Sequence, residues 1–84
     1  MIIPPGPLKV LIATKPVDFR KGVVGLAGLV QNELRLNPFS GVLFIFRCKR
    51  SDRIKLLLWD GTGLVLVTKR LEQGQFRWPR IGDA

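Results

Sequence analysis

The hydrophobic and polar positions divide the chain into one helical segment and several strand-like segments. A continuous apolar run, Val10 to Ala13, lies within a first strand predicted at 8–14 and is typical of a strand covered on both faces. From Phe19 the apolar residues recur at spacings of three and four, which predicts a helix of about four turns ending near Pro38. We expect Asp18 to be its N-cap, because a carboxylate there accepts hydrogen bonds from free backbone amides.

After the helix the pattern is strand-like to the end. Three strands are predicted at 42–47, 53–59 and 64–70, with turns at 48–52 and 60–63, and a short fourth strand at 76–78. The predicted fold class is therefore α+β: one helix packed on a mainly antiparallel sheet of four to five strands, in the order β-α-β-β-β-(β). At 84 residues we expect a single domain, 1–84.

Alternation along these strands predicts how their side chains are divided between the two faces of the sheet. If the first hairpin centres near Arg50, a row of basic residues crosses three strands on one face: Arg47, Arg53 and Arg70, with Lys55 beside them. That face continues as an apolar surface made of Leu43, Leu57, Trp59, Leu64 and Leu66. One helix covers one face, and we expect it on the opposite side, by Phe46 and Leu56. The apolar surface then needs a second copy, a partner protein or further chain.

Composition and charge narrow the classes of function. The chain has 14 Lys plus Arg against 6 Asp plus Glu, a formal charge of +8, no His and one Cys, Cys48. One cysteine excludes a disulfide framework or a zinc knuckle within the chain, and it fits a reducing cytoplasmic location. Neither an export signal nor a long apolar run is evident, so we expect a soluble protein. The few carboxylates form no converging pair, so we expect no enzyme, no metal and no cofactor.

Basic side chains gather in the second half of the chain, and nucleic-acid contact is the activity that they best support. The candidate nucleic-acid-binding residues are Arg47, Lys49, Arg50, Arg53, Lys55, Lys69 and Arg70. A solvated hairpin tip remains the alternative interpretation, because basic surface is common. Trp59 and Trp78 could stack on exposed bases, but burial or an interface is the better interpretation for tryptophan.

Ordered motifs along nearly the whole chain carry a family resemblance. They include Val17-Asp18-Phe19-Arg20-Lys21-Gly22, Asn37-Pro38-Phe39-Ser40-Gly41, Trp59-Asp60-Gly61 and Lys69-Arg70-Leu71-Glu72. In order and spacing they resemble the TnpB (Orf2-like) accessory proteins of insertion-sequence-sixty-six transposons. The resemblance implies a role in DNA transposition beside a separate transposase that carries the catalytic residues. Two departures from the family pattern stand out: many relatives have an acidic residue where Val24 stands, and relatives usually continue beyond the position of Ala84. We expect the further segment of those relatives to cover the Trp59 face, and this chain to compensate for it by pairing with itself.

Two hypotheses follow from these observations. In the first, the chain is a non-catalytic accessory factor that binds DNA, at transposon ends or non-specifically, through the basic residues. In the second, it is a protein-interaction module whose apolar sheet face docks on the transposase or a sister accessory protein, without direct DNA contact. A metal-dependent nuclease is disfavoured by the small number of acidic residues.

Overall fold

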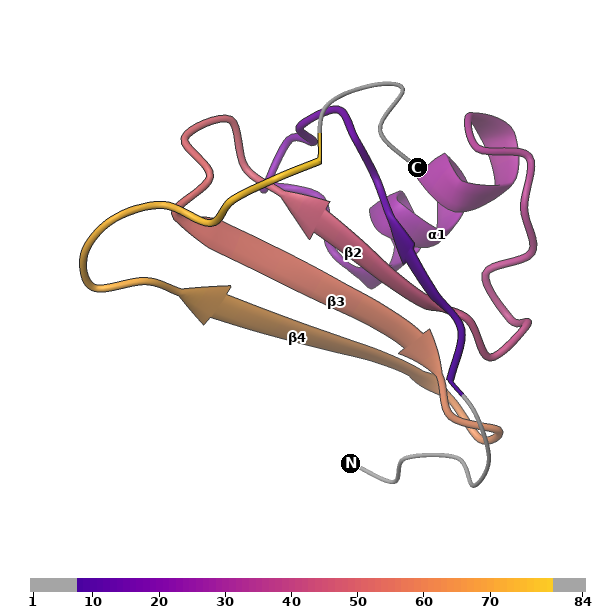
Figure 1. Cartoon of the computed structure of the whole chain (residues 1–84). Coiled ribbons are helices and arrows are strands. Elements are labelled where there is room, and N and C mark those ends of the chain that lie inside the picture. The colour runs from indigo at the N-terminus through magenta and orange to yellow at the C-terminus, as the bar shows by residue number, and fades with distance from the viewer. Residues whose placement is uncertain (1–7, 80–84) are drawn as a thin grey trace.

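The fold is one helix beside a four-stranded sheet, and the computed structural model describes it for residues 8–79. In chain order its elements are β1 (Val10–Ile12), α1 (Val23–Asn32), β2 (Leu43–Arg47), β3 (Arg53–Trp59) and β4 (Leu64–Arg70). The strands lie in the order β1-β2-β3-β4; β1 is parallel to β2, and the other neighbours are antiparallel (Figure 1). The predicted α+β class and the predicted element order are confirmed.

The helix is shorter than its apolar spacing predicts. It begins after Gly22, which is the N-cap and makes no side-chain capping bond, so the expected cap at Asp18 is wrong. Both carboxylate oxygens of Asp18 instead accept hydrogen bonds from Arg20, at 2.7–3.1 Å. At the other end α1 ends at Asn32, and Arg35 adopts a φ of 57° that no right-handed helix contains.

The turn between β2 and β3 sets a register one residue away from the expected one. Ser51 has a φ of 59° and donates its backbone N–H to the Cys48 carbonyl at 3.0 Å. The Cys48 amide then bonds the Arg53 carbonyl at 3.2 Å, and Arg47 pairs with Ile54. Because side chains alternate, this shift of one residue moves Arg47 to the opposite face from Arg53, and the expected row across three strands is wrong.

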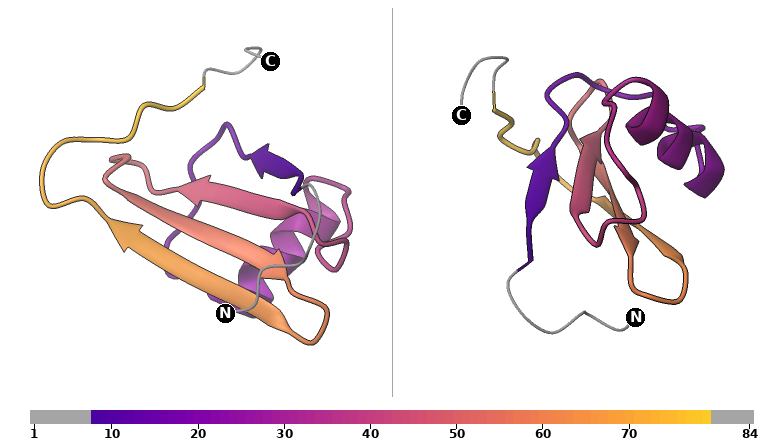
Figure 2. Two further views of the ribbon diagram at one scale, coloured as in Figure 1. Left: turned by 60° about the horizontal axis from the view of Figure 1, so that its bottom comes forward. Right: turned by 90° about the vertical axis from the view of Figure 1, so that its right-hand side faces the viewer.

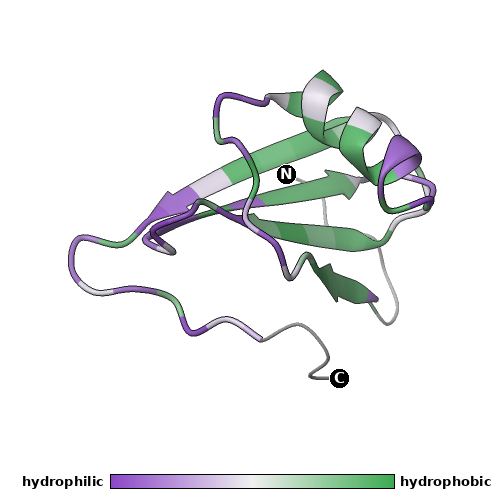
Figure 3. Cartoon of the chain, turned by 90° about the horizontal axis from the view of Figure 1, so that it is seen from above, coloured by the Kyte–Doolittle hydropathy of each residue, from purple (hydrophilic) through white to green (hydrophobic). Residues whose placement is uncertain are grey.

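The same shift decides which face α1 covers. Phe44 and Phe46 now share a face with Leu57, and α1 packs there; the expected place beside Leu56 is wrong (Figure 2). The core consists of Leu26, Ala27, Val30, Phe44, Phe46 and Leu57. Apolar residues of the helix and the strands therefore meet in one layer. The hydropathy colouring marks much of α1 and of the strands as hydrophobic (Figure 3).

The apolar residues assigned to a partner lie mostly inside this layer. Leu57 is 0% exposed, and Leu64 and Leu66 pack against the core. Trp59 is half-buried and meets the Phe39 ring edge-on, with 5.5 Å between ring centroids. Leu43 lies on the opposite face of the sheet. The prediction that these residues form one uncovered surface is wrong, and the face on which we based self-association is covered by α1.

The sheet face turned away from α1 is called the open face here. The strands place on it Leu43, Ile45, Arg47, Ile54, Leu56, Leu58, Val65, Val67 and Lys69. β1 extends the sheet at one edge, where its three residues are 42–48% exposed. The expectation of a strand covered on both faces is therefore wrong, because a continuous apolar run does not distinguish an exposed edge strand from a buried central one.

The residues that follow β4, 71–79, form no strand, so the short strand predicted at 76–78 is wrong. They are called the strap here. The Leu71 amide donates to the Asp52 carbonyl at 2.8 Å and the Phe76 amide to the Ser51 carbonyl at 2.6 Å. Both acceptors belong to the β2–β3 loop, so the strap crosses the end of the sheet instead of extending it (Figure 1).

Replacing Leu57 by Ala should lower the free energy of unfolding by roughly 2–5 kcal/mol, because it leaves a cavity beneath α1. The neighbouring Leu56 is half-buried on the open face, and Leu56→Ala should cost clearly less. Urea unfolding followed by tryptophan fluorescence measures both. A larger loss for Leu56→Ala than for Leu57→Ala would contradict the observed register.

Candidate nucleic-acid interface

Basic side chains collect at the end of the sheet where β2 and β4 end and β3 begins, which is called the basic end here. The hydropathy colouring shows hydrophilic residues gathered there, while the rest of each strand is apolar (Figure 3). Its members are the seven predicted residues Arg47, Lys49, Arg50, Arg53, Lys55, Lys69 and Arg70. They do not share one face. Arg53, Lys55 and Arg70 point to the α1 side, Arg47 and Lys69 belong to the open face, and Lys49 and Arg50 are on the loop.

Arg53 and Arg70 stand directly opposite each other in the β3–β4 ladder. Both are exposed, and like charges in such a pair oppose folding. The Arg53 guanidinium lies over the Phe19 ring, 5.3 Å from its centroid, and its Nε is 3.9 Å from an oxygen of Asp52. The ring and the carboxylate lessen the repulsion but leave both guanidinium groups accessible to an anion.

The Lys55 ammonium group makes its contacts within the protein. Its Nζ donates hydrogen bonds to the carbonyls of Phe19 and Lys21, each at 2.8 Å, and lies 4.9 Å from the centre of the Phe19 ring. The ammonium group therefore holds the segment that leads into α1 against the sheet. A phosphate would have to compete with two carbonyls and an aromatic ring for it.

The tether of Lys55 brings two further basic residues, Arg20 and Lys21, to the basic end. Both are exposed, and neither was among the predicted site residues. The contact joins residues 34 and 36 positions apart, so no local spacing in the sequence signals it. Arg20 is paired with Asp18, so the net positive charge added to the α1 side of the basic end is that of Lys21.

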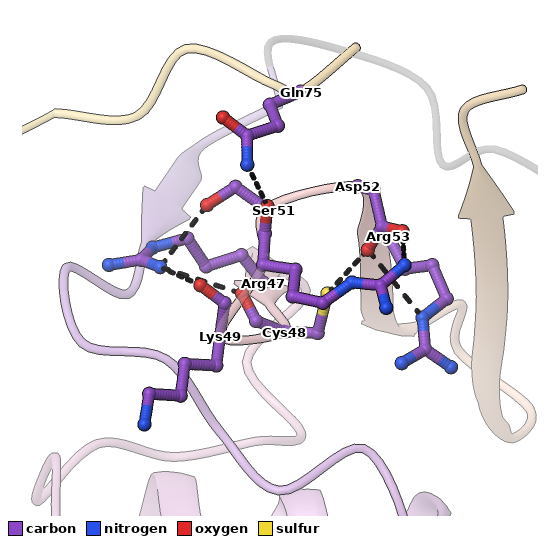
Figure 4. A network of polar contacts seen from close by, with 8 residues as sticks. Arg47, Cys48, Lys49, Ser51, Asp52, Arg53 and Gln75 are labelled. Carbon is purple, nitrogen blue, oxygen red and sulfur yellow. Dashed lines mark hydrogen bonds and ion pairs between the residues drawn. The ribbon is translucent and has the colours of Figure 1, made fainter. Parts of the chain in front are cut away.

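The Arg47 guanidinium is also bound within the protein, to oxygen atoms of the β2–β3 loop. One terminal nitrogen donates to the Cys48 and Lys49 carbonyls at 3.5 and 3.4 Å and to Ser51 Oγ at 3.2 Å (Figure 4). Its Nε is buried and has no hydrogen-bond partner among the described residues. The guanidinium carbon lies 6.0 Å from the centre of the Trp78 ring. Arg47 thus shapes the loop, while the Lys49 side chain points away from it (Figure 4).

Asp52 is the one carboxylate within the segment from Arg47 to Lys55. It accepts a hydrogen bond from the Cys48 thiol at 3.1 Å and from the Arg50 guanidinium at 2.9 Å. These two bonds, the thiol's first, lower its pKa to about 2, and the same contact raises the pKa of Arg50. Asp52 therefore remains ionised and fixes the loop; it offsets one positive charge and leaves the segment from Arg47 to Lys55 positive overall.

The other acidic side chains with defined contacts serve turns. Asp60 accepts bonds from Thr62 and Gly63 in the β3–β4 turn, as the predicted turn at 60–63 requires. Over residues 8–79 no three His, Cys, Asp or Glu side chains gather as metal ligands. No helix in the same range is long and apolar enough to cross a membrane. The basic end is therefore a positively charged surface on which, among the described residues, no cluster of metal ligands is found.

Comparison with known proteins assigns the family. Residues 8–84 match the family model described as IS66 Orf2 like protein. The uncharacterized protein y4jC of Sinorhizobium fredii is 47% identical over 83 residues, which are 99% of this chain and 71% of that protein. A second one from the same organism, y4hO, is 46% identical over 72 residues, covering 86% and 63%. No solved structure matches.

The chain belongs to the IS66 Orf2-like family. This membership confirms the resemblance drawn from the motifs and implies an accessory role associated with transposition. Neither the family nor the relatives indicate a catalytic activity. The chain spans about two thirds of the length of the two relatives.

Replacing Lys55 by Met keeps the apolar stem and removes the two bonds to the Phe19 and Lys21 carbonyls. We expect the free energy of unfolding to fall by about 1–2 kcal/mol, because a charged donor is lost from two backbone carbonyls, and the bond to Phe19 is part-buried. Lys69→Met removes the same charge from an exposed position and should change it by less than about 0.5 kcal/mol. Equal effects in chemical denaturation would contradict the tether.

The lowered pKa of Asp52 predicts a loss of stability in acid. A carboxylate whose pKa is lower in the folded protein stabilises it above the ordinary value of 3.8, and this contribution disappears as the pH falls toward about 2. Urea midpoints between pH 5 and 2 should therefore fall less steeply for Asp52→Asn than for the wild type. Glu72→Gln, a change at an exposed carboxylate, is the charge-matched control and should keep the wild-type slope.

Proposed function

We propose that this protein is a non-catalytic accessory factor of transposition that binds DNA through its basic end. The contact residues in this proposal are Lys49, Arg50, Arg53, Lys69 and Arg70, together with Arg20 and Lys21. Arg47 and Lys55 support them from within the fold. Family membership supports the setting, and the charge distribution supports the ligand.

The observation that carries the proposal is the pairing of Arg53 with Arg70. Two exposed guanidinium groups face each other across neighbouring strands, an arrangement that disfavours folding of the free protein. A polyanion bound across both would convert the repulsion into two favourable contacts. The phosphate backbone of DNA supplies such closely spaced negative charges.

Phosphate contact is the mode that these residues support best. Arginine and lysine at strand ends and in a loop fix the position of a protein on the duplex, and such contacts carry no sequence information by themselves. The protein would then place or stabilise the transposase complex on DNA, while recognition of a sequence stays with other components. Release of counterions makes such binding strongly dependent on salt.

The alternative is a protein-interaction module that docks on the transposase or a sister accessory protein without touching DNA. The open face favours it, since Ile45, Ile54, Leu56 and Val67 form an apolar surface there without helix cover from α1. In that case the positive charge serves solubility or steers the encounter with the partner.

Titration against a fluorescent transposon-end duplex and a scrambled duplex tests the proposal. We expect binding at about 50 mM salt that weakens steeply by about 200 mM. In the variant Arg53→Gln/Arg70→Gln the slope of log K against log salt should fall by about 2, because two phosphate contacts are lost.

The variant Lys9→Gln/Arg35→Gln is the matched control, because it removes two exposed charges from outside the basic end. It should keep nearly the wild-type slope. Equal losses in both variants would show that only net charge matters. An absence of binding by the wild type at low salt would favour the interaction module.

A further inference from the structure

The strap is attached to the loop that carries Lys49 and Arg50. Hydrogen bonds from the strap reach the carbonyls of three consecutive loop residues: Gln75 Nε2 to Arg50 at 2.8 Å, the Phe76 amide to Ser51 at 2.6 Å and the Leu71 amide to Asp52 at 2.8 Å. At the far end, Trp78 Nε1 donates to the Ala13 carbonyl, just beyond β1, at 2.7 Å. The strap therefore spans from the end of β4, across the loop, to the end of β1 (Figures 1 and 2).

Arg47 contacts both the strap and the loop. Its guanidinium faces the Trp78 ring at 6.0 Å and bonds loop oxygens through its terminal nitrogen. The Nε, which no described residue satisfies, lies in the same buried place. Removing the ring would open this place to water and weaken the hold of Arg47 on the loop.

Two features of the loop act against the shape that Arg47 and Asp52 give it. Ser51 stands in the left-handed region, which a non-glycine residue with a side chain adopts at a cost. Lys49 and Arg50 are adjacent like charges on the same short connection. Both features favour a looser loop, and the three bonds from the strap oppose them (Figure 4 shows the bond from Gln75).

We propose that Trp78 is a positioning residue for the DNA contact: by holding Arg47 and the end of β1, it keeps the strap in place, and the strap fixes the loop that presents Lys49 and Arg50. This inference rests on the proposed function. It assigns Trp78 a role through the protein scaffold, with no stacking on a base.

Hydrogen exchange on the free protein tests whether Trp78 holds the strap and the loop in place. In Trp78→Ala the amides of Ser51 and Phe76 should exchange at least about tenfold faster, while the core amide of Leu57 keeps its protection. Trp78→Phe, which keeps a ring beside Arg47 but loses the bond to Ala13, should lie between. Unchanged rates at Ser51 would overturn the proposal.

The strap also offers a matched glutamine pair. Gln75→Ala removes the bond to the Arg50 carbonyl, whereas Gln73→Ala changes an exposed strap residue that makes no hydrogen bond with the described residues. Faster exchange at Ser51 in Gln75→Ala alone supports the attachment. Equal rates in the two variants would overturn it.

A double-mutant cycle tests positioning in DNA binding. Trp78→Ala should weaken duplex binding about three- to tenfold at 50 mM salt, and Lys49→Gln/Arg50→Gln should cost less in the Trp78→Ala background than in the wild type. Additive losses would overturn the positioning role and leave the proposed function standing. No binding by the wild type would overturn both, and the exchange rates would then show whether the strap still holds the loop.

Discussion

The turn between β2 and β3 is the constraint on which the rest of the structure depends. Ser51, in a left-handed conformation, closes the turn onto Cys48 and sets Arg47 opposite Ile54. That register puts Phe44, Phe46 and Leu57 on one face, where α1 covers them. A shift of one residue would exchange the faces of β2 relative to β3 and separate the aromatic residues from the leucine they pack against.

The positive charge of this protein has two physical roles. Lys55 and Arg47 are bound to backbone carbonyls and aromatic rings, so their charge holds the entry to α1 and the β2–β3 loop. Arg53 and Arg70 are exposed and stand opposite each other in the β3–β4 ladder, and their repulsion is what supports the proposed contact with an anion. A basic cluster in a sequence does not separate these roles, because they depend on which oxygen or ring lies within reach.

Through the strap, segments that are far apart in the sequence form the basic end together. Residues after β4 bond the loop after β2, and a tryptophan near the end of the strap bonds the carbonyl after β1. The arrangement explains how a charged loop receives a defined shape in a fold whose described residues, 8–79, form one short helix. The proposed DNA contact at the basic end and the alternative docking on the open face involve different parts of the described fold, so the two can be separated by experiment.

The sequence by itself determined the α+β class, the order of the elements, the bounds of β2, β3 and β4 within a residue, and the family. These follow from local periodicity and from turn residues such as Asp60 and Gly61. Only the tertiary structure decided the first hairpin's register, the face under α1 and the partners of Arg47 and Lys55. Each of these depends on one backbone conformation at Ser51 or on contacts between residues far apart in the chain, and neither leaves a pattern in neighbouring positions.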